Sequence, residues 1–272
     1  MIHKIIPLRE DDARVTLTTY IADERYESRD ALLVIPGGGY SGVCADREGE
    51  PIALAFLARG YNCFVLHYSV GEDAKFPRPL VDAALAMQYI REHAEEFCID
   101  ANRVFAVGFS AGGHLCASLG TLWNSPELRE AMPEMKEGIN RPTGTILSYA
   151  VLSASIRTHY GSFYNILGTK TPTEEELARY SLELRVDENT SPAFIWHTAD
   201  DPVVPIANAI VMQKALAEKG IPFAVRIYPH GPHGLALANE LTARGDARFI
   251  DSEAAKWVEE ADAWMQTVPS LA

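Results

Sequence analysis

The segment GFSAG at residues 108–112 places a serine between two glycines, where an apolar run (104–107) meets a helix-compatible stretch (111–119). A serine at such a strand-to-helix junction can act as a nucleophile, because the sharp turn lifts its hydroxyl above the sheet edge. The following helix directs its N-terminus at the same place, which favours developing negative charge. Ser110 is therefore a candidate nucleophile for acyl transfer. The alternative for so short a motif is a glycine-rich turn that only starts a helix.

Three consecutive glycines follow an earlier apolar run, residues 31–35. Acyl transfer produces an oxyanion, and backbone N–H groups that are fixed in advance stabilise it well. Glycines allow the backbone to approach a substrate closely. We expect the N–H groups of Gly38, Gly39 and Ala111 to form an oxyanion hole. The alternative is that the glycines form a flexible turn.

Two later junctions between a strand and a loop carry acids and histidines in the order that such a site requires. The apolar run 193–196 leads into HTADDPVVP, and the run 223–228 leads into PHGPHG. A serine nucleophile needs a base, and the base needs an acid that holds its tautomer. Between the two adjacent acids we favour Asp201, because it starts the turn before the next helix, and regard Asp200 as a solvated loop carboxylate.

Four histidines are candidates for the base. We favour His233 over His230, because Gly234 follows it and frees the backbone near a substrate. His197 is expected to end its strand as a hydrogen-bonded structural residue. His114 lies on the helix behind the serine and is expected to pack there or to support the site from behind.

Apolar, β-rich runs alternate with amphipathic stretches along the chain, which is typical of a mostly parallel sheet with helices on both faces. We expect strands at residues 2–8, 15–20, 31–35, 62–68, 103–107, 145–151, 193–196 and 223–228. We expect helices at residues 51–58, 80–97, 206–219 and 253–267. The serine, acid and histidine segments then meet at the carboxyl edge of one sheet, in a single α/β domain that covers residues 1–272.

Residues 154–191 interrupt this alternation with a polar stretch. Its aromatic residues are Tyr160, Phe163, Tyr164 and Tyr180. Thr173 is followed by three glutamates, which predicts a helix start, since the hydroxyl can cap the helix and the acids suit its N-terminus. An insertion between two sheet strands is expected to form a small cap over the site. The alternative is a surface loop with one helix.

The composition is that of a soluble globular protein, with 272 residues, 47% hydrophobic and 22% charged. A net charge of −13 is poorly suited to binding nucleic acid or anionic lipid surfaces. No run approaches the roughly 18 apolar residues that span a bilayer, and the first residues are too short an apolar stretch for a signal-peptide core. We therefore expect a cytoplasmic protein with no nucleic-acid or membrane partner. The sequence leaves a homo-oligomer open.

The four cysteines have no C-x-x-C spacing, so neither a zinc site nor a redox motif is expected. Cys63 and Cys116 stand inside apolar runs and are interpreted as small core residues. Serine-based acyl transfer needs no metal and no organic cofactor, and we expect none.

Six segments, taken in order, carry a family resemblance. They are PGGGY (36–40), R-x-G-E-P (47–51), F-P-x-P-x-x-D (76–82), GFSAGGH (108–114), W-H-T-A-D-D-x-x-V-P (196–205) and Y-P-x-G-x-H-G (228–234). This set resembles the bacterial acetyl-xylan-esterase-like and feruloyl-esterase-like α/β hydrolases, from about residue 31 to residue 264. Pro36 stands where such hydrolases have the histidine of an H-G-G-G loop, and residues 154–191 match least.

The resemblance implies the α/β-hydrolase fold and a triad of Ser110, Asp201 and His233. It also implies a serine carboxylesterase that hydrolyses small acyl esters, acetyl above all, on a sugar or a xylan-derived oligosaccharide. A serine peptidase of the prolyl-oligopeptidase type shares this fold and triad order, but it usually carries a large extra domain for which this chain lacks the length. A non-catalytic ligand-binding relative predicts a broken triad, whereas each member has a candidate here.

Overall fold

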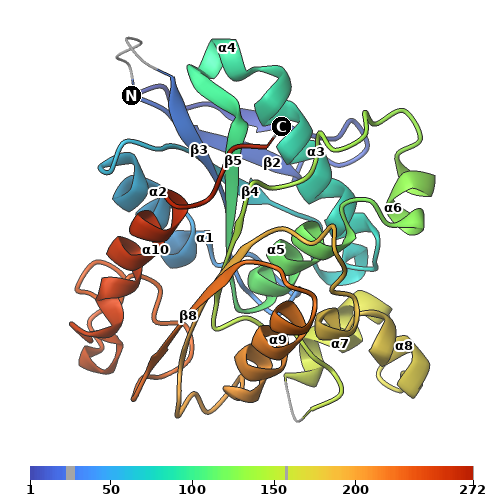
Figure 1. Cartoon of the computed structure of the whole chain (residues 1–272), viewed down its shortest axis with the longest axis vertical. Coiled ribbons are helices and arrows are strands. Elements are labelled where there is room, and N and C mark those ends of the chain that lie inside the picture. Colours follow the sequence, from blue (N-terminus) through green and yellow to red (C-terminus); the bar gives the residue numbers. More distant parts are fainter. Residues whose placement is uncertain (23–27, 157–158, 272) are drawn as a thin grey trace.

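The computed structural model describes residues 1–22, 28–156 and 159–271. These residues form one eight-stranded sheet in the order β1-β2-β4-β3-β5-β6-β7-β8 (Figure 1). The strands are β1 (Ile5–Pro7), β2 (Thr16–Tyr20), β3 (Arg29–Ile35), β4 (Asn62–His67), β5 (Ile99–Phe109), β6 (Thr145–Ser148), β7 (Ala193–Thr198) and β8 (Phe223–Tyr228). The pairs β1–β2 and β2–β4 are antiparallel, and every other neighbouring pair is parallel. The expected mostly parallel sheet is confirmed.

Helices cover both faces of the sheet. They are α1 (Ala45–Glu48), α2 (Glu50–Leu57), α3 (Arg78–Glu92), α4 (Ala94–Phe97), α5 (Ser110–Leu122), α6 (Pro126–Ala131), α7 (Tyr160–Leu167), α8 (Glu174–Arg179), α9 (Ala207–Glu218) and α10 (Trp257–Met265). Figure 1 shows α2 and α10 on one side of the sheet and α3, α5 and α9 on the other. Short 3-10 turns add η1 (Gly71–Asp73), η2 (Leu182–Leu184), η3 (Ala247–Phe249) and η4 (Ala254–Lys256).

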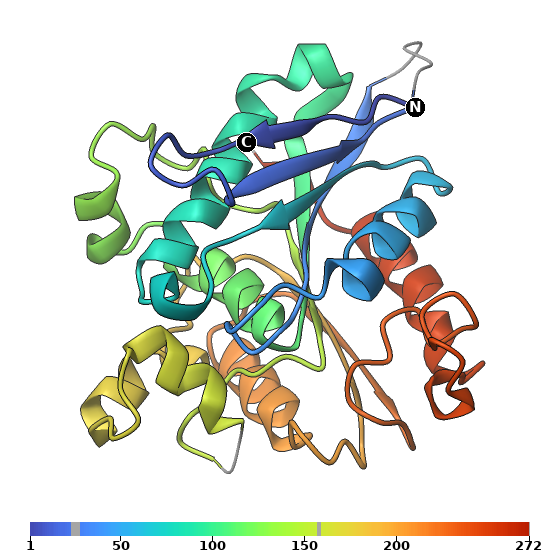
Figure 2. The ribbon, with the colours of Figure 1, turned by 180° about the vertical axis from the view of Figure 1, so that it is seen from behind.

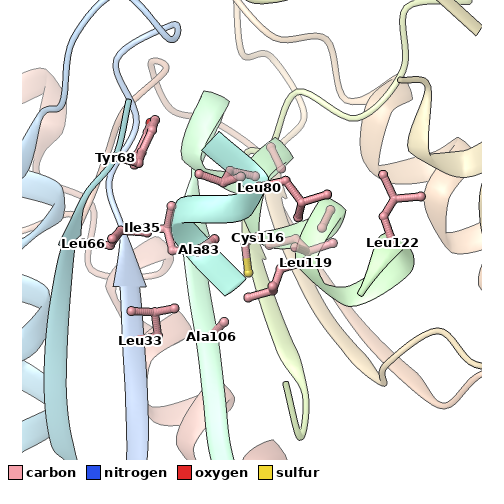
Figure 3. Packing of buried hydrophobic residues seen from close by; sticks show 14 of the residues in the cluster. Leu33, Ile35, Leu66, Tyr68, Leu80, Ala83, Ala106, Cys116, Leu119 and Leu122 are labelled. Atoms are coloured by element: carbon pink, nitrogen blue, oxygen red, sulfur yellow. The ribbon is translucent and has the colours of Figure 1, made fainter. Parts of the chain in front are cut away.

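The central strand β3 shows why its sequence is an unbroken apolar run. Leu33 and Ile35 belong to the apolar cluster beneath α3 and α5, part of which Figure 3 shows. Leu32 and Val34 alternate with them and belong to the cluster beneath α2 and α10. All four side chains are fully buried. A strand covered on both faces has no polar side, so period-two alternation is lost.

Some predicted elements differ from the structure. The helix expected at residues 80–97 is two helices, because His93 leaves the helical conformation and its ring bonds the Tyr89 carbonyl at 2.8 Å. Strand β5 begins at Ile99, ahead of the apolar run that predicted it. Strand β6 ends at Ser148 instead of continuing to residue 151. The helices α1, α6 and α7 were not predicted.

The segment between β6 and β7 contains α7, α8 and η2. The predicted helix start at Thr173 is confirmed, with a capping box between Thr173 and Glu176. Residues 157 and 158 of the expected cap lie outside the described residues. In both views α7 and α8 lie at the end of the molecule away from the two chain termini (Figure 1 and Figure 2).

The four cysteines are free thiols, and Cys63 and Cys116 are buried as expected. Within the described ranges, we find no helix whose length and apolar character would let it cross a membrane.

Candidate active site

The candidate nucleophile stands at the junction that its motif requires. Strand β5 ends at Phe109, and Ser110 begins α5 directly afterwards. Its φ is +54°, a conformation that residues other than glycine rarely adopt and that marks strain. Gly112 must be glycine, because a Cβ there would lie 2.2 Å from the Pro36 carbonyl oxygen. This close approach brings the turn at Ser110 against the glycine loop that follows β3.

Ser110, His233 and Asp201 form a continuous chain of hydrogen-bond contacts. The serine Oγ lies 2.7 Å from Nε2 of His233, and Nδ1 of the same ring lies 2.7 Å from Oδ2 of Asp201. The other carboxylate oxygen accepts the N–H groups of Val203 and Val204 at 2.8 and 2.9 Å. The junction of β5 with α5 and the loops after β7 and β8 therefore bring together the three residues that were favoured from the sequence.

Asp201 is suited to remain a carboxylate. Its side chain is fully buried, and burial by itself would raise its pKa. Hydrogen bonds from His197 and His233 oppose this effect and hold the pKa of Asp201 below its usual range. His197 is the hydrogen-bonded strand-end residue that was expected, with Nε2 2.8 Å from the Val204 carbonyl oxygen. The same nitrogen lies 3.5 Å from Asp201, so this histidine also supports the acid.

The two residues that the sequence analysis set aside also meet. Nδ1 of His230 lies 2.9 Å from Oδ2 of Asp200, and the Gly231 N–H donates to Oδ1 of that aspartate. Both side chains are exposed. The loops after β7 and β8 thus hold two Asp–His pairs, of which the buried one, Asp201–His233, contacts Ser110.

The glycine loop lies beside the serine. Gly38 has a φ of +131°, and a Cβ there would lie 2.1 Å from the Gly42 carbonyl oxygen, so the turn requires glycine. The Asn165 amide, from α7, donates to the Gly39 carbonyl oxygen at 2.8 Å. Gly38, Gly39 and Ser110 line one cavity of about 260 Å³. Ala111, the third expected donor, is the next residue of α5.

Polar groups surround this cavity. Its remaining lining residues are Ser41, Cys44, Arg47, Glu48, His159, Val203 and His233. His159 reaches the cavity from the segment between β6 and β7, and its Nδ1 lies 3.0 Å from the Ser162 hydroxyl. Burial, and secondarily the nearby His233, lower the pKa of His159, which favours the neutral form of its ring.

His114 packs behind the serine, as the sequence analysis expected. Its Nδ1 lies 2.9 Å from the Tyr40 hydroxyl, and its Nε2 lies 2.9 Å from the Tyr180 carbonyl oxygen. Burial lowers the pKa of His114 to about 4. A neutral ring that donates to the carbonyl can accept the Tyr40 O–H, so this histidine joins the glycine loop to residue 180.

Sequence reasoning missed three residues beside the site. Glu48 was passed over as the variable position of R-x-G-E-P, His159 was not singled out within the polar segment, and Tyr149 was assigned to a strand interior. A buried carboxylate in a short helix after a glycine loop gives no periodic signal. The one available hint was a charged pair, Arg47 and Glu48, directly before a glycine.

In the part of the chain that the structure describes, no group of three or more His, Cys, Asp or Glu residues is placed to hold a metal ion.

The BD-FAE family model matches residues 17–216 of this chain. The chain belongs to the BD-FAE family. The chain is also similar to two curated proteins: it is 43% identical to Endo-1,4-beta-xylanase B of Butyrivibrio fibrisolvens over 215 residues, and 31% identical to the acetylxylan esterase of Xylanibacter ruminicola over 232 residues. These matches cover 78% and 84% of this chain, but only 33% and 45% of the relatives. The chain thus spans less than half the length of either relative.

A solved structure extends the likeness to nearly the whole chain. The acetyl ester-xyloside bifunctional hydrolase from Caldicellulosiruptor lactoaceticus superposes with a TM-score of 0.83 at 31% identity. The match covers 97% of this BD-FAE member and 96% of that chain. Together with the eight-stranded, mostly parallel sheet, this likeness shows the α/β-hydrolase fold.

Proposed function

We propose that this BD-FAE member is a serine carboxylesterase that works through an acyl-enzyme. The observation that carries the proposal is the unbroken contact from Ser110 through His233 to Asp201, at 2.7 Å for each step. Nucleophile, base and orienting acid in this order are the parts that acyl transfer requires. The glycine loop beside the serine supplies the fourth part, a set of fixed backbone donors.

Each residue has one role in the proposed reaction. His233 Nε2 takes the proton of the Ser110 hydroxyl, and the serine oxygen attacks the ester carbonyl. The N–H groups of Gly38, Gly39 and Ala111 stabilise the oxyanion. His233 then gives its proton to the alcohol as the C–O bond of the ester breaks. A water molecule repeats the sequence on the acyl-enzyme and releases the carboxylic acid.

The substrate class that we propose is a small acyl ester, acetyl above all, on a sugar or a xylan-derived oligosaccharide. A cavity of about 260 Å³ suits a short acyl group. The polar residues around it, among them Ser41 and His159, suit a hydroxylated alcohol. The names of the acetylxylan esterase and of the acetyl ester-xyloside hydrolase support the same class. We assign the segment 154–191 the role of a cap, because its His159 lines the cavity.

Two measurements test the proposal. A fluorophosphonate probe should label the wild-type protein at Ser110 and should leave Ser110→Ala unlabelled. A series of p-nitrophenyl esters should show highest kcat/KM at acetate, with release of acetate from acetylated xylo-oligosaccharides. Absence of labelling in wild type would favour a ligand-binding protein, and faster cleavage of a peptide amide than of the acetate ester would favour a peptidase.

A further inference from the structure

A buried carboxylate lies behind the glycine loop and has no role in the steps proposed above. Glu48, the last residue of α1, is 1% exposed. Its Oε2 accepts the Gly37 N–H at 2.9 Å, and its Oε1 accepts the Tyr149 O–H at 2.8 Å. Burying a carboxylate is costly unless hydrogen bonds satisfy it. Here both oxygens are satisfied, one by the glycine loop and one by a tyrosine.

Tyr149 carries the connection onward to the loop of the candidate base. It follows β6 directly with a φ of +37°, and it is 2% exposed. Its hydroxyl accepts the Ala236 N–H at 3.0 Å while donating to Glu48. Its ring contacts the His233 ring edge to face, with centroids 5.1 Å apart. One side chain therefore contacts the imidazole and fixes the backbone three residues beyond it.

Arg47, beside Glu48 in α1, contacts the same loop at a second point. Its Nη1 donates to the Gly234 carbonyl oxygen at 3.2 Å, and its Nη2 lies 4.0 Å from Oε1 of Glu48. Residues 234 and 236, both just after His233, are thus tied to α1 through different partners. The glycine loop is tied to the same helix through Gly37.

The proposed chemistry needs this connection. The oxyanion donors, at residues 38 and 39, and the base, at residue 233, come from distant parts of the chain and must act on one carbonyl group. Such groups must be held within about 0.5 Å of the productive geometry, by neighbours that are themselves fixed. Hydrogen bonds to an ionised group are stronger than neutral ones, so a buried carboxylate is an effective fixed point.

We propose that Glu48 and Tyr149, supported by Arg47, are positioning residues that hold the glycine loop and the His233 loop in a fixed position relative to each other. This inference rests on the proposed function, since it explains how two parts of the proposed machinery stay aligned. In this proposal the residues neither exchange a proton nor form a bond with the substrate. They act through Gly37 on the oxyanion donors, and on the base through residues 234 and 236 and through the contact of the Tyr149 ring with His233.

The decisive variants are Glu48→Gln and Tyr149→Phe. An error of about 1 Å in alignment can cost about a hundredfold in rate. We therefore expect kcat for p-nitrophenyl acetate to fall by about tenfold to a hundredfold, with KM changing less than about threefold. Labelling of Ser110 by the fluorophosphonate should slow in parallel. Because both variants break one network, the double variant should be only slightly slower than the slower single variant.

A matched control separates positioning from stability. Tyr61 is also buried, and its hydroxyl donates to the Asp262 carboxylate at 2.6 Å, on the α10 side of the sheet. Tyr61→Phe should lower the unfolding midpoint as Tyr149→Phe does, yet leave kcat unchanged. If Glu48→Gln does not fold, Tyr149→Phe decides the question, because it leaves the carboxylate and its bond to Gly37 in place.

The outcomes are distinguishable from failure of the proposed function. Wild-type kcat in Tyr149→Phe and in any folded Glu48→Gln, while Ser110→Ala is inactive, would overturn the positioning role alone. Multiplicative losses in the double variant would also overturn it, since they would show that the two residues act independently. An active Ser110→Ala would instead overturn the proposed esterase mechanism.

Discussion

The loops after β7 and β8 hold two Asp–His pairs that look nearly alike by distance. Asp201 lies 2.7 Å from His233, and Asp200 lies 2.9 Å from His230. Their environments differ sharply. The side chains of the first pair are 0% and 15% exposed, and those of the second are 53% and 83% exposed. Water screens the exposed pair Asp200–His230, here called the outer pair, so its attraction adds little to stability. The buried pair Asp201–His233, the inner pair, interacts where screening is weak.

The third partner differs as well. The inner histidine has a hydroxyl at its far nitrogen, because Ser110 Oγ lies 2.7 Å from Nε2. The outer pair has instead the Gly231 N–H, which donates to Asp200 and fixes the turn of the loop. A short Asp–His distance is therefore not enough to identify a catalytic pair. Burial and the group on the far side of the ring carry the assignment.

The largest effect should come from removing the groups that only the inner pair reaches. Ser110→Ala and His233→Ala should each lower kcat for p-nitrophenyl acetate by about 10⁴- to 10⁶-fold, because nucleophile and base act as one unit. The measurement is steady-state hydrolysis, with circular dichroism to show that the fold is kept. His230→Ala is the matched control and should retain kcat within about twofold. A comparable loss of kcat in His233→Ala and His230→Ala would contradict the assignment of His233 alone as the base.

Substitution of the two aspartates should give a difference in kcat nearly as large as that between the two histidines. Asn at position 201 keeps the shape of the side chain but can place an N–H against Nδ1 of His233 and so favour the wrong tautomer. Asp201→Asn should lower kcat by about 10³- to 10⁴-fold, and Asp200→Asn by less than about threefold. The comparison is kcat for the two variants under identical conditions. A larger loss at Asp200 would reassign the acid.

The dependence of stability on acid pH should also distinguish the inner pair from the outer pair. Hydrogen bonds from His197 and His233 outweigh the effect of burial and hold the pKa of Asp201 below its usual value. A lowered folded-state pKa means that this carboxylate stabilises the fold above about pH 3.8, its unfolded value, and loses that contribution as pH falls. Urea unfolding should find Asp201→Asn about 1–3 kcal/mol less stable than wild type at pH 7. That difference should shrink at pH 3, and a constant difference would contradict the linkage.

The smallest effect belongs to the outer pair. The hydrogen bond from His230 lowers the pKa of Asp200, but both side chains face water. Asp200→Asn and His230→Ala should each leave the urea midpoint close to that of wild type, and any small difference should shrink in 1 M salt, because water and ions screen an exposed pair. Urea titrations at low and high salt measure this. A clear, salt-independent fall of the urea midpoint in either variant would place the pair in a structural role.

The middle of the sheet could be predicted because its central strands are buried on both faces. Continuous apolar runs mark β3, β4 and β7, and their order with the intervening helices fixes the class of fold. The polar start of β5, residues 99–102, carried no such signal, and the predicted strand was accordingly too short. Helix α1 has four residues, too few to show a helical period.

The candidate site could be predicted only in part, for a related reason. Ser110, Asp201 and His233 follow the ends of strands, in segments whose glycines, prolines and chain order point to one chemistry. Glu48 has no such context, and its partner Tyr149 lies 101 residues away. A buried carboxylate is recognised by what surrounds it, and those surroundings exist only in the folded chain.

The contacts of the segment 154–191 with the glycine loop and with α5 bear on protein engineering by recombination. Asn165 binds the Gly39 carbonyl with its side chain, whereas residue 180 binds His114 with its backbone. A segment transplanted from another family member must therefore keep an asparagine at position 165. At position 180 it needs only a backbone carbonyl in the same place, whatever the side chain. Libraries of variants in which this segment is randomised will change turnover together with substrate selectivity unless these two contacts are held constant.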